Sequence, residues 1–454
     1  MFILRKFTQA FVFLASKCLP DSFVLVAILS LVVFCLTYFT TKQDVISIIN
    51  HWGNGAWSLL GFSMQMALVL VLGQALANAR LVSSFLRRLS SLPKGSFASI
   101  VLVTLLSLLT NWINWGFGLV ISAIFAKEIA KNVKGVDYRL LIASAYSGFV
   151  VWHGGLSGSI PLSLATGGED LRKITLGVIT QPINISQTIF SSYNLIIIAV
   201  ILVGLPFLLA SVHPKKEDSV TIDPKLLSIE EKDIELIDHQ KDKTLAHFLE
   251  NSSLINYLLT IFGLVYLVNY FLSGGGLTLN IVNMIFLLLG IFLHKTPIAY
   301  VRAISHSTKS AAGILLQFPF YAGIMGMMTG HNEGQNSLAS LLSLMFVNIS
   351  NEHTLPLFTF LSAGIVNVFI PSGGGQWAIQ APIMLPAGAS LGVDPSVVAM
   401  AIAWGDAWTN MIQPFWALPA LAIAGLGAKD IMGYCVLTLL FVGLVVCFGF
   451  YFLV

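Results

Sequence analysis

The sequence predicts an all-α polytopic membrane protein with two inverted repeats, each containing a re-entrant hairpin and a broken transmembrane helix. Of the 454 residues, 56% are hydrophobic and only 10% are charged, whereas soluble domains have about 25% charged residues. Many apolar runs are long enough to cross a bilayer. Two polar stretches that contain glycine, NWINWGFG at 111–118 and PSGGGQWAIQ at 371–380, interrupt apolar segments and cannot continue a regular helix.

The composition argues against several other classes of protein. The net charge of +3 comes without a basic patch, so nucleic acid is not an expected partner. The four cysteines, Cys18, Cys35, Cys435 and Cys447, lack the spacing of a metal site, and no cluster of histidine and glutamate suits zinc. We therefore expect no cofactor other than a coupling ion, and no enzymatic activity.

The composition changes along the chain and divides it into five parts. The apolar stretch at the start is followed by Lys17 and Pro20 and not by a signal-peptide cleavage site, so we expect a helix that lies on the membrane surface. The only long hydrophilic stretch is a predicted charged cytoplasmic linker. The parts are the interfacial helix 1–22, the first repeat 23–211, the linker 212–253, a connector helix 254–278 and the second repeat 279–454.

Nine segments are predicted to cross the membrane. Seven are continuous apolar runs, and two are interrupted, by WHGGLSGS at 152–159 and by WGDAWTNMIQP at 404–414. We interpret the interrupted runs as broken helices. The nine segments are 23–40, 55–78, 139–165, 191–211, 255–272, 279–294, 310–329, 396–424 and 431–454.

Two further apolar segments, 97–126 and 355–389, are predicted to be re-entrant hairpins. Two crossings need roughly 40 residues, and these segments have 30 and 35, with the polar stretch in the middle of each. A non-helical tip at membrane depth is tolerated only where it is buried in protein or lines a cavity.

The distribution of lysine and arginine predicts the orientation. With a cytoplasmic N-terminus, 21 of the 24 basic residues fall on the cytoplasmic side, and only Lys42, Arg172 and Lys173 fall outside. This agrees with the positive-inside rule. We expect a multi-pass membrane protein with a cytoplasmic N-terminus and a C-terminus on the outer side of the membrane.

An offset of 257 residues aligns the two hairpin regions without a gap. Gly116 then matches Gly373, Gly118 matches Gly375, and the tripeptide GVD at 135–137 matches GVD at 392–394. Five predicted crossings lie between the start of the first repeat and the start of the second repeat. Because five is an odd number, the second repeat begins on the opposite side of the membrane and is therefore inverted. Inverted repeats with broken helices are typical of secondary transporters, which bind substrate where the breaks face each other.

The residues at the breaks are neutral donors and carbonyls. Helix N-termini at the breaks supply free N–H groups and a positive dipole end, and no lysine or arginine lies within a span. These features favour a short monocarboxylate over di- or tricarboxylates. The substrate-binding candidates are Asn111, Asn114, Gly116, Gly118, Ser157, Ser372, Gly373, Gly374, Gly375, Gln376, Thr409 and Asn410. A wider set adds Gly154, Ser159, Gln413, Gln65 and Gln317.

Asp406 is the one acidic residue placed inside a span, and His153 lies in the other broken helix. Because intramembrane acids are costly and usually functional, we predict that both residues take part in coupling to H⁺ or Na⁺. Oxygen ligands suit a small hard cation, and a predicted sodium site consists of Asn114, Ser372, Asp406 and Asn410. A purely structural hydrogen bond is the alternative for each residue. The tryptophans near the breaks either seal the tips by packing or form walls for an acyl chain.

Three stretches resemble the bacterial short-chain fatty acid transporter family: NWINWGFGLV, PSGGGQWAIQ and, at 413–435, QPFWALPALAIAGLGAKDIMGYC. The resemblance covers essentially the whole chain. It implies membership of the ion transporter superfamily, inner-membrane uptake of acids such as acetoacetate or butyrate, and elevator-like movement, often as a homodimer. Two alternatives stay open, a carrier for another small organic anion and an intramembrane hydrolase that uses His153 with Ser157.

Overall fold

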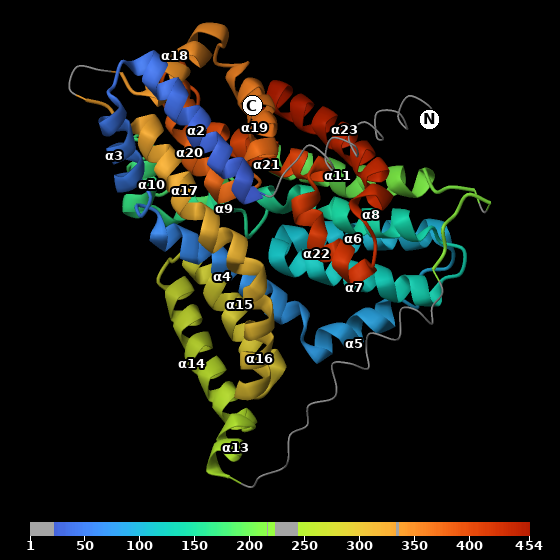
Figure 1. Ribbon diagram of the computed structural model, residues 1–454. Coiled ribbons are helices and arrows are strands. Elements are labelled where there is room, and N and C mark those ends of the chain that lie inside the picture. Colours follow the sequence, from blue (N-terminus) through green and yellow to red (C-terminus); the bar gives the residue numbers. More distant parts are fainter. Residues whose placement is uncertain (1–21, 216, 223–243, 333–335) are drawn as a thin grey trace.

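The computed structural model describes residues 22–215, 217–222, 244–332 and 336–454, and all regular secondary structure in these ranges is helical (Figure 1). Nearly all of the predicted interfacial helix 1–22 and the middle of the predicted linker 212–253 lie outside the described residues. The all-α prediction is confirmed for the part of the chain that is described.

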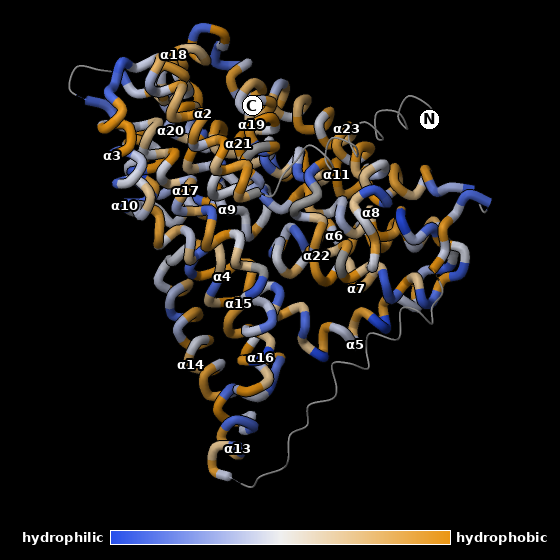
Figure 2. The backbone as a smooth tube through the Cα atoms, viewed as in Figure 1, coloured by the Kyte–Doolittle hydropathy of each residue, from blue (hydrophilic) through white to orange (hydrophobic). Residues whose placement is uncertain are grey.

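Eight of the described helices are long and apolar enough to cross a membrane. Figure 2 shows hydrophobic residues along most of their length and hydrophilic residues concentrated in the peripheral connections. The chain is therefore a polytopic membrane protein. The eight are α2 (Ser22–Thr41), α4 (Leu60–Ala77), α6 (Ser96–Ile113), the run α8–η1–α9 (Tyr138–Thr166), α11 (Ser192–Ser211), α14 (Ser253–Leu272), α17 (Ala312–Thr329) and α23 (Ala428–Phe452).

Each of the nine predicted crossings corresponds to a helix or to a broken helix. Seven of them match seven of the eight crossing-length helices just named. Of the remaining two, one is a shorter helix and the other is a broken helix. The eighth crossing-length helix, α6, is an arm of the first predicted hairpin. The shorter segment is α15 (Leu279–His294), which has the predicted bounds. The second broken helix consists of α21 (Pro395–Thr409), η4 (Asn410–Ile412) and α22 (Pro414–Ala424). In the first broken helix, η1 (Gly148–Gly154) separates α8 (Tyr138–Ser147) from α9 (Ser159–Thr166).

The two predicted hairpins are pairs of helices that break at the predicted tips. The first pair, α6 and α7 (Trp115–Asn132), meets at Asn114, and the second, α19 (Leu355–Phe369) and α20 (Gly373–Leu391), meets at residues 370–372. The arms extend beyond the predicted segments 97–126 and 355–389. An 18-residue helix is about 27 Å long, so length alone does not distinguish a hairpin from two crossings. The re-entrant depth stays a prediction.

Several short helices were not predicted, because each is too short to give an apolar run of membrane length. Asp44 caps α3 by accepting a hydrogen bond from the Ser47 N–H. Figure 1 shows α14, α15 and α16 as an arm that projects from the rest of the molecule, with α13 at its tip. The short helices are α3 (Val45–Gly55), α5 (Arg80–Leu89), α10 (Gly168–Ile174), η2 (Ile185–Gln187), α13 (Leu245–Glu250), α16 (Pro297–Thr308), η3 (Lys309–Ala311) and α18 (Leu338–Ile349).

The repeated tripeptide GVD has the same structural role in both halves. Gly135 and Gly392 have positive φ angles of 83° and 77°, a conformation that glycine adopts without steric cost. Asp137 and Asp394 then cap α8 and α21 by accepting hydrogen bonds from backbone N–H groups of the first turn. The motif therefore starts the broken helix of each half.

A close helix contact is also repeated at the offset of 257. A side chain at Gly148 would meet Ser107 on α6, and one at Gly405 would meet Gly364 on α19. Ser107 and Gly364 are themselves 257 residues apart. The broken helix of each half thus crosses the first hairpin arm at the same point. The inversion of the second half relative to the membrane stays a prediction.

The first described part of the linker forms hydrogen bonds with the start of α8. The Val220 N–H donates to Asp137 Oδ2 at 2.8 Å, and the Tyr138 N–H donates to Val220 O at 2.8 Å. The Asp137 N–H in turn donates to His213 Nε2 at 3.0 Å. Asp137 is fully buried, so this contact attaches the linker to the first broken helix.

Single-cysteine labelling tests the topology. In a background without the four native cysteines, cysteines at Lys94 and Lys134 should react only with reagent on the cytoplasmic side. Cysteines at Asn332 and Gly392 should react only from the periplasm, because odd numbers of crossings separate the two groups. Labelling of Asn332→Cys from the cytoplasm alone would contradict both the crossing number and the inversion.

Candidate functional site

A narrow cavity lies between the tips of the two hairpins. Its open volume is about 30 Å³, room for about two water molecules, so a larger ligand would have to part the tips. No charged side chain lines it in the part of the chain that the structure describes. Its lining residues are Met66, Trp115, Phe149, Trp152, Ser159, Gly313, Ile314, Gln317, Phe318, Tyr321, Pro371, Ser372, Gly373, Gly374 and Trp416.

The two hairpin tips have closely similar backbone geometry. Asn114 precedes α7 with φ −155° and ψ 120°, and Ser372 precedes α20 with φ −159° and ψ 111°. Each side chain caps its helix: Asn114 Oδ1 accepts from the Phe117 N–H at 2.9 Å, and Ser372 Oγ accepts from the Gly375 N–H at 3.2 Å. The first N–H groups of α20 have no acceptor within the helix and lie at the cavity.

Each of the three consecutive glycines at the second tip fits against aromatic or polar side chains. A Cβ atom at Gly373 would come within 2.5 Å of His153 Cε1 and 2.8 Å of Ser159 Oγ. A Cβ at Gly375 would come within 2.5 Å of the Tyr321 ring. The glycines therefore allow α20 to approach η1 and α17 more closely than any other residue would.

Aromatic rings form most of the cavity wall and carry unpaired donors. The Trp115 ring packs 5.6 Å from Trp152 and 5.2 Å from Trp416, and Phe149 stacks on Trp152. The indole N–H groups of Trp115 and Trp152 are buried and have no acceptor among the described residues. An unpaired buried donor is unfavourable, so both groups suit a ligand that accepts hydrogen bonds.

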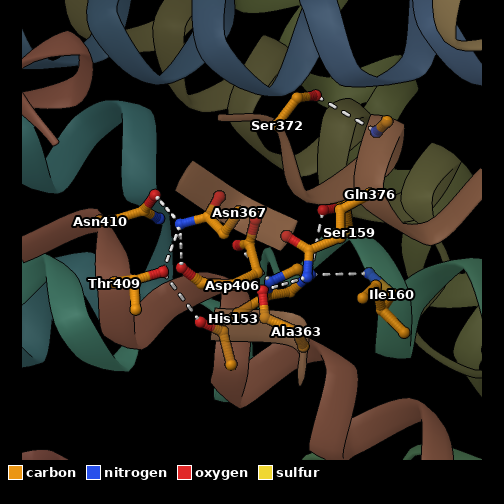
Figure 3. A network of polar contacts seen from close by, with 12 residues as sticks. His153, Ser159, Ile160, Ala363, Asn367, Ser372, Gln376, Asp406, Thr409 and Asn410 are labelled. Atoms are coloured by element: carbon orange, nitrogen blue, oxygen red, sulfur yellow. Dashed lines mark hydrogen bonds and ion pairs between the residues drawn. The ribbon is translucent and has the colours of Figure 1, made fainter. Parts of the chain in front are cut away.

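Asp406 and His153 form a buried pair between the two broken helices (Figure 3). His153 Nδ1 lies 2.9 Å from Asp406 Oδ2, although the residues are 253 positions apart. On the other side of the ring, His153 Nε2 accepts from the Ile160 N–H at 3.1 Å and lies 3.2 Å from Ser159 Oγ. Because a backbone N–H can only donate, Nε2 is unprotonated and Nδ1–H donates to Asp406. The second carboxylate oxygen, Oδ1, is buried without a partner in the described structure.

Asn367 on α19 organises a second group of polar contacts, and no feature of the sequence had predicted this role. Its amide lies within hydrogen-bond distance of Asp406 O at 2.8 Å, Thr409 Oγ1 at 3.0 Å and Asn410 Oδ1 at 2.8 Å (Figure 3). Gln413 donates to the Asn367 carbonyl. Asn367 therefore stabilises the point where α21 breaks. It bonds to the backbone carbonyl of Asp406, and the carboxylate of Asp406 bonds to His153.

Comparison with known proteins agrees with this membrane architecture. Residues 3–453 match the family described as short chain fatty acid transporter. The chain belongs to the short-chain fatty acid transporter family. It is 45% identical over 447 residues to an Escherichia coli (strain K12) protein named "Putative short-chain fatty acid transporter", with 98% of each chain covered. A Haemophilus influenzae protein of the same name is 44% identical over 452 residues, with 99% of each covered.

The fold of this family member is also similar to a solved structure. The Alcanivorax borkumensis YdaH transporter aligns with a TM-score of 0.57 at 17% sequence identity, and the alignment covers 96% of this chain and 97% of that one. At this identity the likeness concerns the fold alone. It supports the helical membrane architecture built from the sequence.

Three of the predicted substrate residues, Ser372, Gly373 and Gly374, line the cavity of this transporter-family protein, together with Ser159 and Gln317 of the wider set. The others hold helices together. Ser157 accepts a hydrogen bond from the Trp115 N–H at 3.0 Å, and so joins the first broken helix to the first tip.

The predicted residues of the first hairpin have packing roles. Asn111 donates to Ser107 on its own helix and lies where a side chain at Gly118 would lie. A Cβ at Gly116 would meet the backbone of Leu70 on α4 at 3.0 Å.

The predicted residues of the second half that do not line the cavity bond mainly to α19 and α20. Gln376 donates to Ala363 O at 2.9 Å, and Thr409 donates to Gly364 O at 2.8 Å.

The oxygens predicted to bind sodium are mostly occupied by other partners. Asn114 and Ser372 serve as helix caps, and Asn410 Oδ1 accepts from Asn367. Asp406 Oδ2 accepts from His153, and only its Oδ1 is without a partner in the described structure. We assign no metal ligand among these residues.

A larger residue at the second tip should disturb the site. In Gly373→Val the side chain would push against His153 and Ser159, and overpacking of this kind costs about 1–3 kcal/mol. We expect lower thermal stability in detergent and loss of substrate uptake in proteoliposomes. Gly53→Val is the matched control, because Gly53 lies on a helix with open space around it. Wild-type uptake by Gly373→Val would show that the close approach is dispensable.

Asn367→Ala should destabilise the second broken helix. The change removes the donor shared by three buried acceptors, and leaving such groups unpaired costs about 1–3 kcal/mol. Thermal unfolding in detergent measures the effect against Asn78→Ala, a change at an exposed helix end. Equal stability of the two variants would contradict the role given to Asn367.

Proposed function

We propose that this protein imports short-chain monocarboxylates, such as butyrate or acetoacetate, across the bacterial cytoplasmic membrane by cation-coupled alternating access. The substrate would bind in the cavity between the hairpin tips. Its carboxylate would face neutral donors, and its acyl chain would lie against the aromatic wall. Family membership supports the transport of short-chain acids, and the chemistry of the cavity supports the single carboxylate.

The observation that carries the proposal is the set of unpaired neutral donors in an uncharged, aromatic cavity. Trp115 and Trp152 supply indole N–H groups, and the start of α20 supplies backbone N–H groups at the positive end of a helix dipole. Such donors can hold one carboxylate. A second carboxylate in the same cavity would lack a cationic partner, and burying an unpaired charge is costly.

The mechanism that we propose uses the narrowness of the cavity. Because its open volume is about 30 Å³, a four-carbon acid would bind only after the hairpin tips move apart and would be enclosed when they return. Alternating access would then expose the cavity to one side at a time, by movement of the hairpin-bearing helices against a scaffold. Asp406 and His153, buried beside the cavity, are the proposed coupling residues.

Binding of radiolabelled butyrate to the purified protein tests the proposal. Unlabelled acetoacetate should compete with butyrate, whereas succinate and citrate should compete weakly. Trp115→Phe and Trp152→Phe keep the wall and remove one donor each. Since a hydrogen bond to a charged group contributes about 1.5–3 kcal/mol, each variant should bind butyrate at least about tenfold more weakly. Trp57→Phe, at an exposed tryptophan, should bind like the wild type.

Competition by succinate as strong as that by butyrate would overturn the monocarboxylate assignment and favour a carrier for another small organic anion. Unchanged affinity in both cavity variants would show that the indole groups do not hold the substrate.

One observation favours a second function. The order Ser159–His153–Asp406, with distances of 3.2 Å and 2.9 Å, is that of a catalytic serine triad. The serine differs from Ser157, which the sequence had suggested. Hydrolysis of p-nitrophenyl butyrate by the purified protein, and its loss in Ser159→Ala, would support this alternative. Membership of a transporter family favours transport.

A further inference from the structure

We propose that protons drive this transporter, and that the single hydrogen of the Ser159 hydroxyl links substrate binding to protonation of His153. The inference rests on the proposed function, because it takes a carboxylate in the cavity as its starting point. It assigns a positioning role to a serine at the wall of the cavity and a proton-binding role to the imidazole behind it.

The starting point is the fixed orientation of the His153 ring. The Ile160 N–H donates to Nε2 at 3.1 Å, and Nδ1–H donates to Asp406 Oδ2 at 2.9 Å. The ring stacks on Trp152 with a centroid distance of 4.0 Å. The imidazole is therefore neutral in this structure, and its one lone pair points toward the first turn of α9.

His153 also supplies the N-terminal cap of α9. The residue at the N-cap position is Gly158, which has no side chain to accept a hydrogen bond. His153 Nε2 takes its place, because it accepts from Ile160, the second residue of the helix. Protonation of Nε2 would place its hydrogen against the hydrogen of the Ile160 N–H and would remove this cap.

Ser159 connects this buried ring to the cavity. Its Oγ lies 3.2 Å from His153 Nε2, and the residue lines the cavity beside Gly373 and Gly374. A serine hydroxyl has one hydrogen and two lone pairs. In the empty site that hydrogen points to Nε2. A carboxylate at the start of α20 would accept the same hydrogen, because an ionised acceptor forms the stronger bond.

Rotation of the Ser159 hydroxyl provides His153 Nε2 with a hydrogen-bond acceptor for a proton. Once the Ser159 hydrogen points to the substrate, a lone pair of Oγ faces Nε2. A proton from a hydronium ion in the water can then form an N–H bond at Nε2, which donates to Ser159 Oγ. The Ile160 N–H loses Nε2 as its acceptor, and the Asp406 carboxylate balances the charge of the imidazolium. One anion and one proton have been bound, and the N–H bond at Nε2 is the only bond formed within the protein. The site has the same net charge empty and loaded, so both forms can move through the membrane.

Among the described residues, no other charged side chain faces this pair. The Tyr321 hydroxyl on α17 donates to Gln317 Oε1 at 2.9 Å. In the described structure, the side chains that face the pair from α9, α19 and α20 are hydroxyl and amide groups, at Ser159, Asn367 and Gln376. His153 and Asp406 are therefore the groups whose protonation the substrate can alter.

Proton uptake by the detergent-solubilised wild-type protein is the direct test. Butyrate is added to protein in weak buffer with a pH indicator, and bound butyrate is measured in parallel. We expect about one proton taken up for each bound anion, since one site is protonated per carboxylate. Ser159→Ala removes one donor to the carboxylate and should bind butyrate about tenfold more weakly. At saturating butyrate it should take up far less than one proton for each bound anion. Butyrate binding without proton uptake by the wild type would overturn the inference and leave the proposed function intact.

Transport in proteoliposomes gives the second test. A gradient of one pH unit should sustain about tenfold accumulation, because it corresponds to 1.4 kcal/mol. Protein-free vesicles, through which the undissociated acid diffuses, set the background. His153→Gln keeps a donor for Asp406 and an acceptor for Ile160 but cannot be protonated, so it should exchange butyrate without accumulating it. His306→Gln, at an exposed histidine, is the matched control.

The outcomes separate the two proposals. Wild-type accumulation by His153→Gln, or accumulation driven by a sodium gradient alone, would overturn the proton linkage while the carrier function stands. Absence of butyrate binding and transport in the wild type would instead overturn the proposed function. Loss of exchange in a His153→Gln variant of normal thermal stability would also count against the linkage, since this variant keeps both hydrogen bonds.

Discussion

The structure depends on one constraint, that every backbone polar group within a membrane segment needs a partner. The helices are interrupted at both hairpin tips and within both broken helices, and each interruption leaves N–H and C=O groups exposed. Side chains satisfy some of these groups: Asn114 and Ser372 cap the tips, His153 caps α9, and Gln413 donates to the carbonyl of Asn367. These hydrogen bonds stabilise the breaks.

The same constraint explains why the site is neutral and rich in donors. A break exposes more N–H groups than its caps can satisfy. The start of α20 lines the cavity together with Trp115 and Trp152, whose buried indole N–H groups have no acceptor among the described residues. An anion can be bound there without a buried cationic side chain. The cost of desolvating a lysine or arginine is avoided.

Some backbone features recur at the offset of 257, but the site is not symmetric. The two GVD motifs start equivalent helices, and Gly148 and Gly405 make equivalent crossings. At the offset of 257, however, Asp406 corresponds to Phe149, and Asn410 corresponds to His153. The first half supplies the imidazole and the second half supplies the carboxylate, and each half contributes three aromatic residues to the cavity wall. The pair of His153 and Asp406 therefore forms only when the two halves pack together.

The sequence by itself determined the helical membrane architecture and the positions of the breaks, because hydropathy, glycine and capping residues act locally along the chain. It also identified Asp406 as the one acidic residue within a predicted span, but only the tertiary structure directed its carboxylate to His153. The choice of Ser159 over Ser157, and the role of Asn367, also depended on tertiary structure. The physical reason is that the chain between Gly154 and Gly158 is not helical, so sequence spacing no longer fixes side-chain direction, and contacts between residues more than 200 positions apart are set only by packing.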